Sequence, residues 1–248
     1  MCGGFIAEIF GWRSIFIFLT IWGLTVMVLV IVRLPETHPH ASRKRISISH
    51  IAMQLILDKK VLGFGLIVGG CNGILFSYFA EGAFYLIEIL GLSASHYGLS
   101  FIAIGSGAML GGIVSRRLQN KLSSKEIMNY GLLIITYTTT IYSCITMINH
   151  YLFSLPSYTM IAVTIISQMI CIFGTCVVTV NALALALVNY RHAIGTASSL
   201  FGFFYYCLIS LFTFFMGFLH NGTLLPMPLY FCSLSYLMIA VNHMCLKS

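Results

Sequence analysis

Apolar residues run in long stretches along this chain, and short polar connections separate them. A transmembrane helix needs about 20 mostly apolar residues, and seven stretches are of that order: Ser14–Val32, Leu62–Leu90, Tyr97–Ser115, Ile127–Ile148, Ser157–Val188, Ala193–Leu219 and Met227–Cys245. The second, fifth and sixth are longer than a bilayer requires, so they are expected to tilt or bend. The pattern predicts an all-α, polytopic membrane protein with about seven transmembrane helices.

Composition agrees with this fold class. Of the 248 residues, 59% are hydrophobic and only 8% are charged, whereas a soluble domain carries about 25% charged residues. The net charge of +7 does not indicate a nucleic-acid partner, because basic and aromatic residues do not interleave as a base-stacking groove requires. The eight cysteines are scattered and show no metal-type spacing, which predicts neither a metal site nor a cofactor.

Basic residues gather in alternate connections. Twelve of the 13 Lys and Arg residues lie between the first and second spans, between the third and fourth, between the fifth and sixth, or after the seventh. The remaining connections, at 91–96, 149–156 and 220–226, contain none. Because basic loops stay on the cytoplasmic side, the N-terminus is predicted outside and the C-terminus in the cytoplasm, in a cell membrane such as the bacterial inner membrane.

Four short stretches carry a resemblance to a known family. They are Gly3-Gly4 followed by FGWRSIF, then RLPET at 33–37, GGIVSRRLQNKL at 111–122, and NALALAL with IGTASSLFGFFYY inside 181–206. Together they resemble the major facilitator superfamily, and within it the bicyclomycin-resistance-like (Bcr/CflA) drug:proton antiporters. GWR and LPET flank one predicted span in register, which makes the signal fairly specific. The resemblance covers nearly all of this chain but only the C-terminal part of the family's architecture.

The resemblance implies a domain organisation. Members have two six-helix halves that hold substrate between them and expose it alternately to each side, and each half contains an inverted three-plus-three repeat. Residues 1–33 then hold the outer end of a truncated helix and the last helix of the first half. Residues 34–60 form the central cytoplasmic loop, and residues 61–248 form the six-helix second half, with repeats at about 61–148 and 157–246.

The expected function is therefore part of a proton-coupled secondary transporter that exports drug-like or small amphipathic compounds by alternating access. Its expected partners are the lipid bilayer, a small-molecule substrate and protons. Residues 1–10 are apolar but too few to cross a bilayer, so the chain is expected to be truncated or split. A separate chain would then supply the missing N-terminal helices. The alternative is a non-transporting fragment of such a transporter.

Two further function classes fit the residues less well. Seven spans with an outside N-terminus also match a seven-helix receptor-like membrane protein. A retinal protein, however, needs a lysine inside its last span, and Lys247 lies beyond that span. An enzyme is not expected, because the spans contain no paired carboxylates, no HExxH and no Ser/His arrangement.

Glu81 and Glu88 are the only acidic residues inside the predicted spans. They are seven positions apart, or two helical turns, so both project from one face of the second span. A carboxylate in hydrocarbon is costly and by default lines a cavity or meets a partner. Glu81 is expected to bind a cationic substrate or to carry the exchanged proton. The alternative is a hydrated group near the outer mouth.

Other polar and aromatic residues of the spans are candidates for the same pathway, since the resemblance implies that the second, third, fifth and sixth spans line the cavity. They are Asn72, Tyr78, Gln168, Asn181, Phe204 and Tyr205. An aromatic, sparsely polar pocket suits bulky amphipathic or cationic compounds through stacking and cation–π contact. The alternative is ordinary packing between helices.

The stretch GGIVSRRLQNKL resembles the superfamily's inner-loop motif and makes Arg116 and Arg117 candidates for gating. Ser115 stands where the motif has Asp, which removes a gating ion pair with the arginines. A second departure follows Glu81. Ala83 stands where the family often has proline, so the second span is expected to be less kinked.

Spacing also predicts local packing. Glycines recur every four residues at Gly65, Gly69 and Gly73, and again at Gly107 and Gly111. They give smooth helix faces for close approach. Within the central loop, the helical spacing of Ile48, Ile51 and Leu55 suggests a short helix on the inner membrane surface, the alternative being a solvated linker. The prolines near Asn221-Gly222-Thr223 favour a turn there over a glycosylation site.

Overall fold

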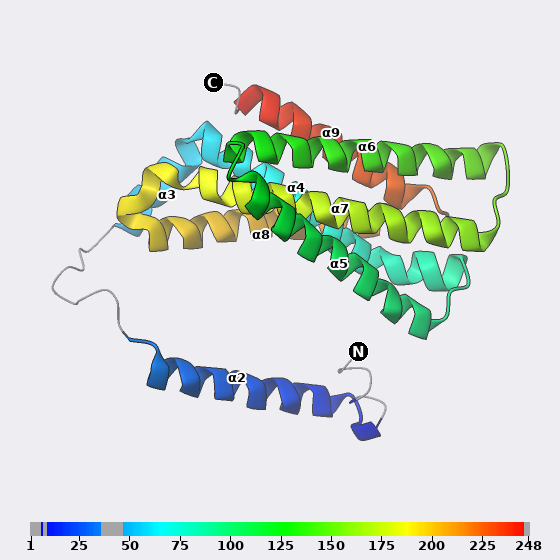
Figure 1. Ribbon diagram of the computed structural model, residues 1–248, viewed down its shortest axis with the longest axis horizontal. Coiled ribbons are helices and arrows are strands. Elements are labelled where there is room, and N and C mark those ends of the chain that lie inside the picture. Colours follow the sequence, from blue (N-terminus) through cyan, green and yellow to red (C-terminus); the bar gives the residue numbers. More distant parts are fainter. Residues whose placement is uncertain (1–5, 7–8, 36–46, 246–248) are drawn as a thin grey trace. The chain divides into compact units, whose positions relative to one another are not determined.

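The computed structural model describes residues 6, 9–35 and 47–245, and nearly all of these residues lie in helices, with no strand among them. The predicted all-α fold is confirmed. The chain divides into two units, Met1–Ile46 and Ser47–Ser248 (Figure 1). The boundary lies inside the predicted central loop, so the end of that loop groups with the six-helix unit.

The first unit contributes one long helix, α2 (Arg13–Arg33). Its 21 residues span about 30 Å at 1.5 Å per residue, the thickness of a bilayer core. The hydroxyls of Thr20 and Thr25 each donate to a carbonyl one turn earlier, both at 2.8 Å. Its threonine hydroxyls are therefore satisfied within the helix, and its surface can meet lipid.

The second unit holds the remaining elements that the structure describes. They are α3 (Ile48–Leu57), α4 (Lys59–Ala83), the π-helix η2 (Phe84–Ile89), α5 (Ala94–Leu118), α6 (Ser124–Tyr151), α7 (Ser157–Ala186), the 3-10 helix η3 (Val188–Ala193), α8 (Ile194–Leu219) and α9 (Pro226–Cys245).

Every predicted span coincides with a helix. In the described chain, six helical segments are long and apolar enough to cross a membrane, namely α2, α4 with η2, α5, α6, α7, and η3 with α8. The seventh predicted span is α9, which falls outside that set. Two prolines at its start and the Asn242-His243 pair near its end make α9 less apolar.

Polar side chains fix where several of these helices begin. The Asp58 carboxylate accepts from the backbone N–H of Lys60 at 2.9 Å and starts α4. Ser123 and Glu126 form a capping box at the start of α6, in which the Ser123 backbone N–H donates to Glu126 at 2.8 Å. Such caps satisfy N–H groups that have no partner within the helix. The short connections therefore determine the register in which each span enters the bundle.

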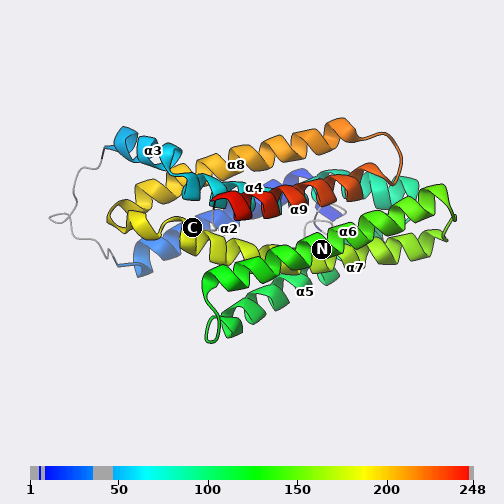
Figure 2. The same ribbon diagram turned by 90° about the horizontal axis from the view of Figure 1, so that it is seen from above.

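The helices of the second unit pair in a pattern that fits two three-helix repeats. The main contacts are α4 with α8, α5 with α7, α6 with α7, α4 with α9, α6 with α9 and α4 with α7. Exchanging α4, α5 and α6 for α7, α8 and α9 leaves this set unchanged. Such a contact pattern agrees with the three-plus-three repeat that the resemblance implies. Figure 2 shows α8 and α5 along opposite edges of the bundle.

The glycine repeat of α4 packs against α8 at regular intervals. A Cβ atom added at Gly69 would lie 2.8 Å from the Leu208 Cβ, and one added at Gly73 would lie 3.0 Å from the Phe212 Cβ. The third contact of this kind joins Gly65 and Phe204. We call these three contacts the α4–α8 ladder. The two residues of each contact are 139 positions apart in the sequence. Glu81 and His220 are separated by the same number of positions. The predicted close approach is confirmed.

The helices α5 and α7 use the same device. A Cβ at Gly111 would lie 2.5 Å from the carbonyl oxygen of Phe173, and one at Gly107 would collide with the carbonyl oxygen of Met169. These contacts are with backbone, which cannot move aside as a side chain can. Small residues thus bring α5 and α7 to near backbone contact, whereas in the α4–α8 ladder they make room for side chains of α8.

The helix suggested by the end of the central loop is present as α3. It buries Ile51 and Leu55, whose exposed fractions are 2% and 5%, while Ile48 remains exposed. The element packs against α8 and α4. The bundle therefore covers Ile51 and Leu55, while Met53, Ile56 and Leu57 of α3 stay exposed as Ile48 does. Three basic residues of the central loop, Arg43, Lys44 and Arg45, lie outside the described residues.

The glycine packing makes a direct prediction. Gly111→Ala should destabilise the protein by about 1–3 kcal/mol, because the added methyl group meets a backbone carbonyl in a tightly packed contact. Gly112→Ala is the matched control, since nothing lies within 4 Å of a Cβ at that position. Thermal unfolding of the detergent-solubilised chain, followed by circular dichroism, measures both. Equal melting temperatures for the two variants would contradict the proposed packing.

Candidate functional site

Glu81 is the only buried acidic residue that the structure describes, with an exposed fraction of 6%. It lies near the end of α4 and accepts a hydrogen bond from Nδ1 of His220, the residue that follows α8. When the carboxylate is ionised it only accepts hydrogen bonds, and Nδ1 then carries the hydrogen. The imidazole side chain is 40% exposed. The pair therefore connects a buried carboxylate to a ring at the surface of this unit.

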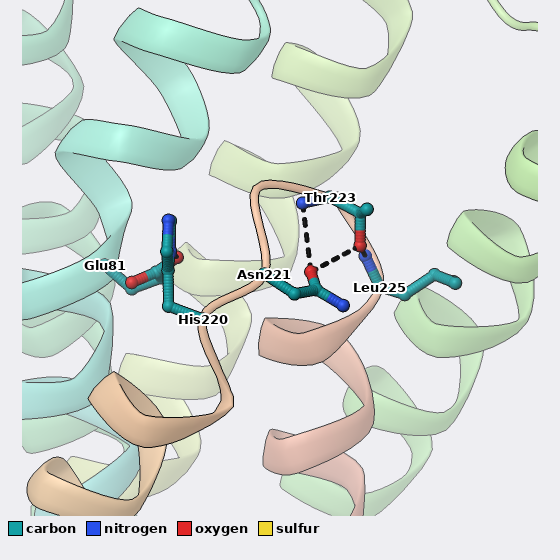
Figure 3. A network of polar contacts seen from close by, with 5 residues as sticks. All are labelled: Glu81, His220, Asn221, Thr223 and Leu225. Atoms are coloured by element: carbon teal, nitrogen blue, oxygen red, sulfur yellow. Dashed lines mark hydrogen bonds and ion pairs between the residues drawn. The ribbon is translucent and has the colours of Figure 1, made fainter.

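A tight turn holds His220 in place (Figure 3). The Asn221 side-chain oxygen accepts from the Thr223 backbone N–H at 3.0 Å and from the Thr223 hydroxyl at 2.7 Å. Gly222 adopts a positive φ of 72°, which suits glycine best. The predicted turn is confirmed, and it directs His220 back to α4.

The helix that carries Glu81 changes from α-helical to π-helical winding at Phe84. Residues Phe84–Ile89 form the π-helix η2, and Gly91, two residues beyond its end, has a positive φ of 74°. A π-turn re-aims the following side chains, and such turns are frequent at functional sites. The aromatic ring of Phe84 lies 5.6 Å from the His220 ring, measured between ring centroids. This irregular turn therefore adjoins the Glu81–His220 pair.

Tyr78 and Gln168 lie inside the six-helix unit, and neither side chain is exposed. The Tyr78 hydroxyl and both amide atoms of Gln168 have no hydrogen-bond partner among the described residues. The ring of Tyr78 packs 6.4 Å from that of Phe101 on α5. A pathway that used these two residues would run within this unit and not over its surface.

The two candidate asparagines have different surroundings. Asn72 is half-buried, and its amide donates to the Val68 carbonyl of its own helix at 2.9 Å. Asn181 is fully buried, donates to the Ser115 hydroxyl at 2.8 Å, and accepts from the Gln119 amide at 3.4 Å. These bonds tie α7 to the end of α5. We call Asn181, Ser115 and Gln119 the inner polar cluster, after the predicted cytoplasmic side.

Phe204 and Tyr205 each line a hollow around the first half of α8. The hollow at Phe204 has a volume of about 460 Å³ and apolar walls from α3, α4 and α8, among them Leu55, Val61 and Cys207. The hollow at Tyr205 has a volume of about 530 Å³ and includes Arg191 and Ser198. Both volumes suit a small molecule.

Arg116 and Arg117 are exposed on the last turn of α5. No ion pair within the described chain involves either of them. Ser115 beside them is buried and bonded to Asn181. This end of α5 is therefore held by a neutral hydrogen bond, as fits the replacement of the motif's Asp by Ser115.

Comparison with known proteins places this geometry in a family. Residues 1–214 match the family model described as Major Facilitator Superfamily. The chain belongs to the Major Facilitator Superfamily. That membership agrees with the paired three-helix repeats of the second unit and with the apolar helices.

The relatives are named as transporters. An uncharacterized transporter of Rickettsia felis is 28% identical over 254 residues, which cover 98% of this chain and 60% of that relative. One from Rickettsia bellii is 28% identical over 239 residues, or 94% of this chain and 58% of the relative. A bicyclomycin resistance protein homolog of Haemophilus influenzae is 27% identical over 135 residues, which cover 53% of this chain and 34% of that relative. The chain thus spans about 60% of the length of the two Rickettsia relatives.

Neither His220 nor the bonds that join Asn181 to Ser115 and Gln119 in this major facilitator chain were predicted from the sequence. A signal for His220 was present, because the glycine repeat at 65, 69 and 73 continues by fours to Ser77 and Glu81. On α8 the matching series continues from Phe212 to Met216 and His220. Only the pairing of α4 with α8 shows that the two series meet.

The inner polar cluster makes a prediction about stability. Asn181→Ala should cost about 1–3 kcal/mol, because it removes the partner of the buried Ser115 hydroxyl. Asn72→Ala is the control and should change stability by less than about 0.5 kcal/mol, since its amide bonds only its own helix. Thermal unfolding in detergent compares the two variants. A larger loss for Asn72→Ala would contradict the assignment.

Proposed function

We propose that this chain forms part of a proton-coupled secondary transporter that exports drug-like or small amphipathic compounds by alternating access. Family membership supports secondary transport, and similarity to a bicyclomycin resistance protein homolog supports drug-like substrates. The observation that carries the proposal is Glu81, a buried carboxylate in a membrane helix bonded to His220. A buried ionisable group of this kind is by default functional.

Glu81 is suited to carry the exchanged proton. Its carboxylate is buried in an apolar helix and is hydrogen-bonded to His220, whose ring lies at the surface of this unit. We infer that the ring links the carboxyl group to that surface and that the exchanged proton takes this route.

The hollows around α8 support an amphipathic substrate. The walls at Phe204 are apolar, which favours a large apolar body. The hollow at Tyr205 contains Arg191, so a cation would be repelled there, although Tyr205 alone would attract it. We infer that compounds with an extended apolar part are preferred, and that a positive charge would bind elsewhere, nearer to Glu81.

We also propose that the chain lies in the cell membrane with its N-terminus outside and its C-terminus in the cytoplasm. Lys59, Lys60, Arg116, Arg117 and Arg191 support this orientation, because all five lie near helix ends on the predicted inner side. His220 then faces the outside and the inner polar cluster faces the cytoplasm.

Alternating access requires two bundles that move around a shared site, and residues 47–245 make up one such unit. We propose that transport needs a second bundle in addition to this one. The part of the Rickettsia felis relative that this chain does not match is a suitable source of it, since the match covers only 60% of that relative.

The test is gradient-driven efflux of an amphipathic fluorescent dye from cells that lack their own exporters. Cells producing this chain together with that part of the relative should expel the dye, and a protonophore should abolish the effect. Glu81→Gln should reduce the rate at least tenfold, because the amide cannot exchange a proton. Glu88→Gln is the matched control: Glu88 is exposed on the same helix, and its loss should leave the rate within twofold.

Two outcomes would contradict parts of the proposal. Gradient-dependent dye movement by the 248-residue chain alone in liposomes would show that no second bundle is needed. Undiminished proton-driven efflux by Glu81→Gln would show that another group carries the proton. A chain that supports no efflux in either setting would favour the alternative of a non-transporting fragment.

A further inference from the structure

We propose that the hollow at Tyr205 binds a small amphipathic anion, whose acidic head group is held by Arg191 and whose apolar chain lies along α7 and α8. This inference rests on the proposed function for the fate of the bound compound, because it names a substrate class for one of the hollows around α8. Binding itself does not depend on transport. The proposal makes Arg191, a residue that the sequence marks only as part of a basic connection, the determinant of selectivity for negative charge.

The hollow lies where two consecutive helices leave the space between them open. The 3-10 helix η3 joins α7 to α8, but these two helices are not among the pairs that make the main contacts of the unit. The wall on α8 is a single helix face, formed by Ile194, Ser198, Phe201 and Tyr205. These eleven positions of helix rise about 16 Å. The hollow is therefore long enough to hold an apolar chain along the helix axis.

Arg191 gives one end of this hollow a positive charge. Its neighbours Tyr190 and Ala193 are buried, and the Tyr190 hydroxyl donates to the Asp58 carboxylate at 3.2 Å. This bond anchors η3 to the start of α4, while Arg191 itself remains exposed. No ion pair or side-chain hydrogen bond within the described chain involves Arg191. A guanidinium in this position favours a carboxylate, sulfonate or phosphate group, to which it can donate two parallel hydrogen bonds.

The other walls of the hollow suit the apolar part of such a compound. Phe201 is buried, and its ring lies 5.6 Å from that of Tyr205, measured between ring centroids. The end of the hollow away from Arg191 is therefore aromatic. Ser198 supplies a hydroxyl between the two ends, and none of the residues that line the hollow is acidic. Charge at one end and apolar walls beyond it match an amphiphile with a single acidic head group.

Two other hollows adjoin the same part of α8 and lack this combination. One is the hollow at Phe204, and the other, of about 500 Å³, is lined by Ile48, Gly195, Thr196, Ser199 and Leu200. The residues that line these two hollows include no charged side chain. A neutral apolar compound can bind at any of the three, whereas an acidic head group gains a partner only beside Arg191. The expected order of affinity at the hollow at Tyr205 is therefore anion, neutral compound, cation.

The experiment is photolabelling of the full 248-residue chain in bilayers of zwitterionic phosphatidylcholine. The probe is dodecanesulfonate with a diazirine at the end of its chain, because a sulfonate stays ionised at any pH used. Mass spectrometry should locate the label within residues 183–188 and 198–205. Unlabelled dodecanesulfonate should displace the probe at concentrations about tenfold lower than dodecanol requires, since a charge-assisted hydrogen bond is lost with the alcohol. Dodecyltrimethylammonium should displace it least.

Variants separate the charge from the shape of the hollow. Arg191→Gln should weaken displacement by the sulfonate about tenfold and leave displacement by dodecanol unchanged. Arg191→Lys should retain part of the preference, because the charge remains but the paired donors are lost. Lys121→Gln is the matched control, since Lys121 is exposed on the same predicted side and does not line the hollow. Ala184→Phe places a ring inside the hollow and should reduce labelling without a change of charge, which provides a second test if Arg191→Gln does not fold.

Several results would overturn the proposal. These are label confined to other segments, equal displacement by sulfonate and alcohol, and an unchanged preference in Arg191→Gln. A further arm adds phosphatidylglycerol to the bilayer, and the probe should remain bound. Its displacement by that lipid would identify the occupant as a bilayer phospholipid and overturn the assignment to a small molecule. Labelling needs neither a proton gradient nor a second bundle, so failure of this binding and failure of the proposed transport are distinguishable.

Discussion

The packing of α4 on α8 at four-residue intervals is the constraint on which the rest of this molecule depends. Helices in a bilayer gain nothing from burying apolar surface against one another, so close approach must come from shape. Glycines at 65, 69 and 73 supply a groove, and Phe204, Leu208 and Phe212 fill it. The same spacing carries Glu81 to His220. A carboxylate that would be costly in hydrocarbon is thereby given a partner.

Glycines also allow α5 and α7 to approach closely, but the groups that join the end of this helix pair are different. Gly107 and Gly111 bring the helices to backbone contact, and the end is closed by the neutral bond between Ser115 and Asn181. The two helix pairs exchange places under the repeat that relates the halves of the unit. One pair ends in a carboxylate and an imidazole, which are ionisable, and the other ends in neutral groups.

Much of the fold could be predicted from the sequence, because hydrophobic length alone defines a membrane helix. The fifth predicted span, Ser157–Val188, differs from α7 by two residues. Glycine spacing likewise predicted close contacts. What the sequence could not provide was the partner of each face, since periodicity identifies a stripe but not the helix that covers it. Hence neither the bonds of Asn181 to Ser115 and Gln119 nor the pairing of His220 with Glu81 could be predicted.

The most direct test of this account is whether Glu81 and His220 are neighbours in the membrane. Replacing both by cysteine, as Glu81→Cys with His220→Cys, should allow a disulfide to form on mild oxidation, and mass spectrometry of the linked peptides identifies it among the native cysteines. A disulfide needs Cα atoms within about 7 Å, so the pair Glu88→Cys with His220→Cys should not cross-link. Efficient linkage of the first pair only is the predicted result. Linkage of the second pair in its place would show that α4 and α8 meet in a different register.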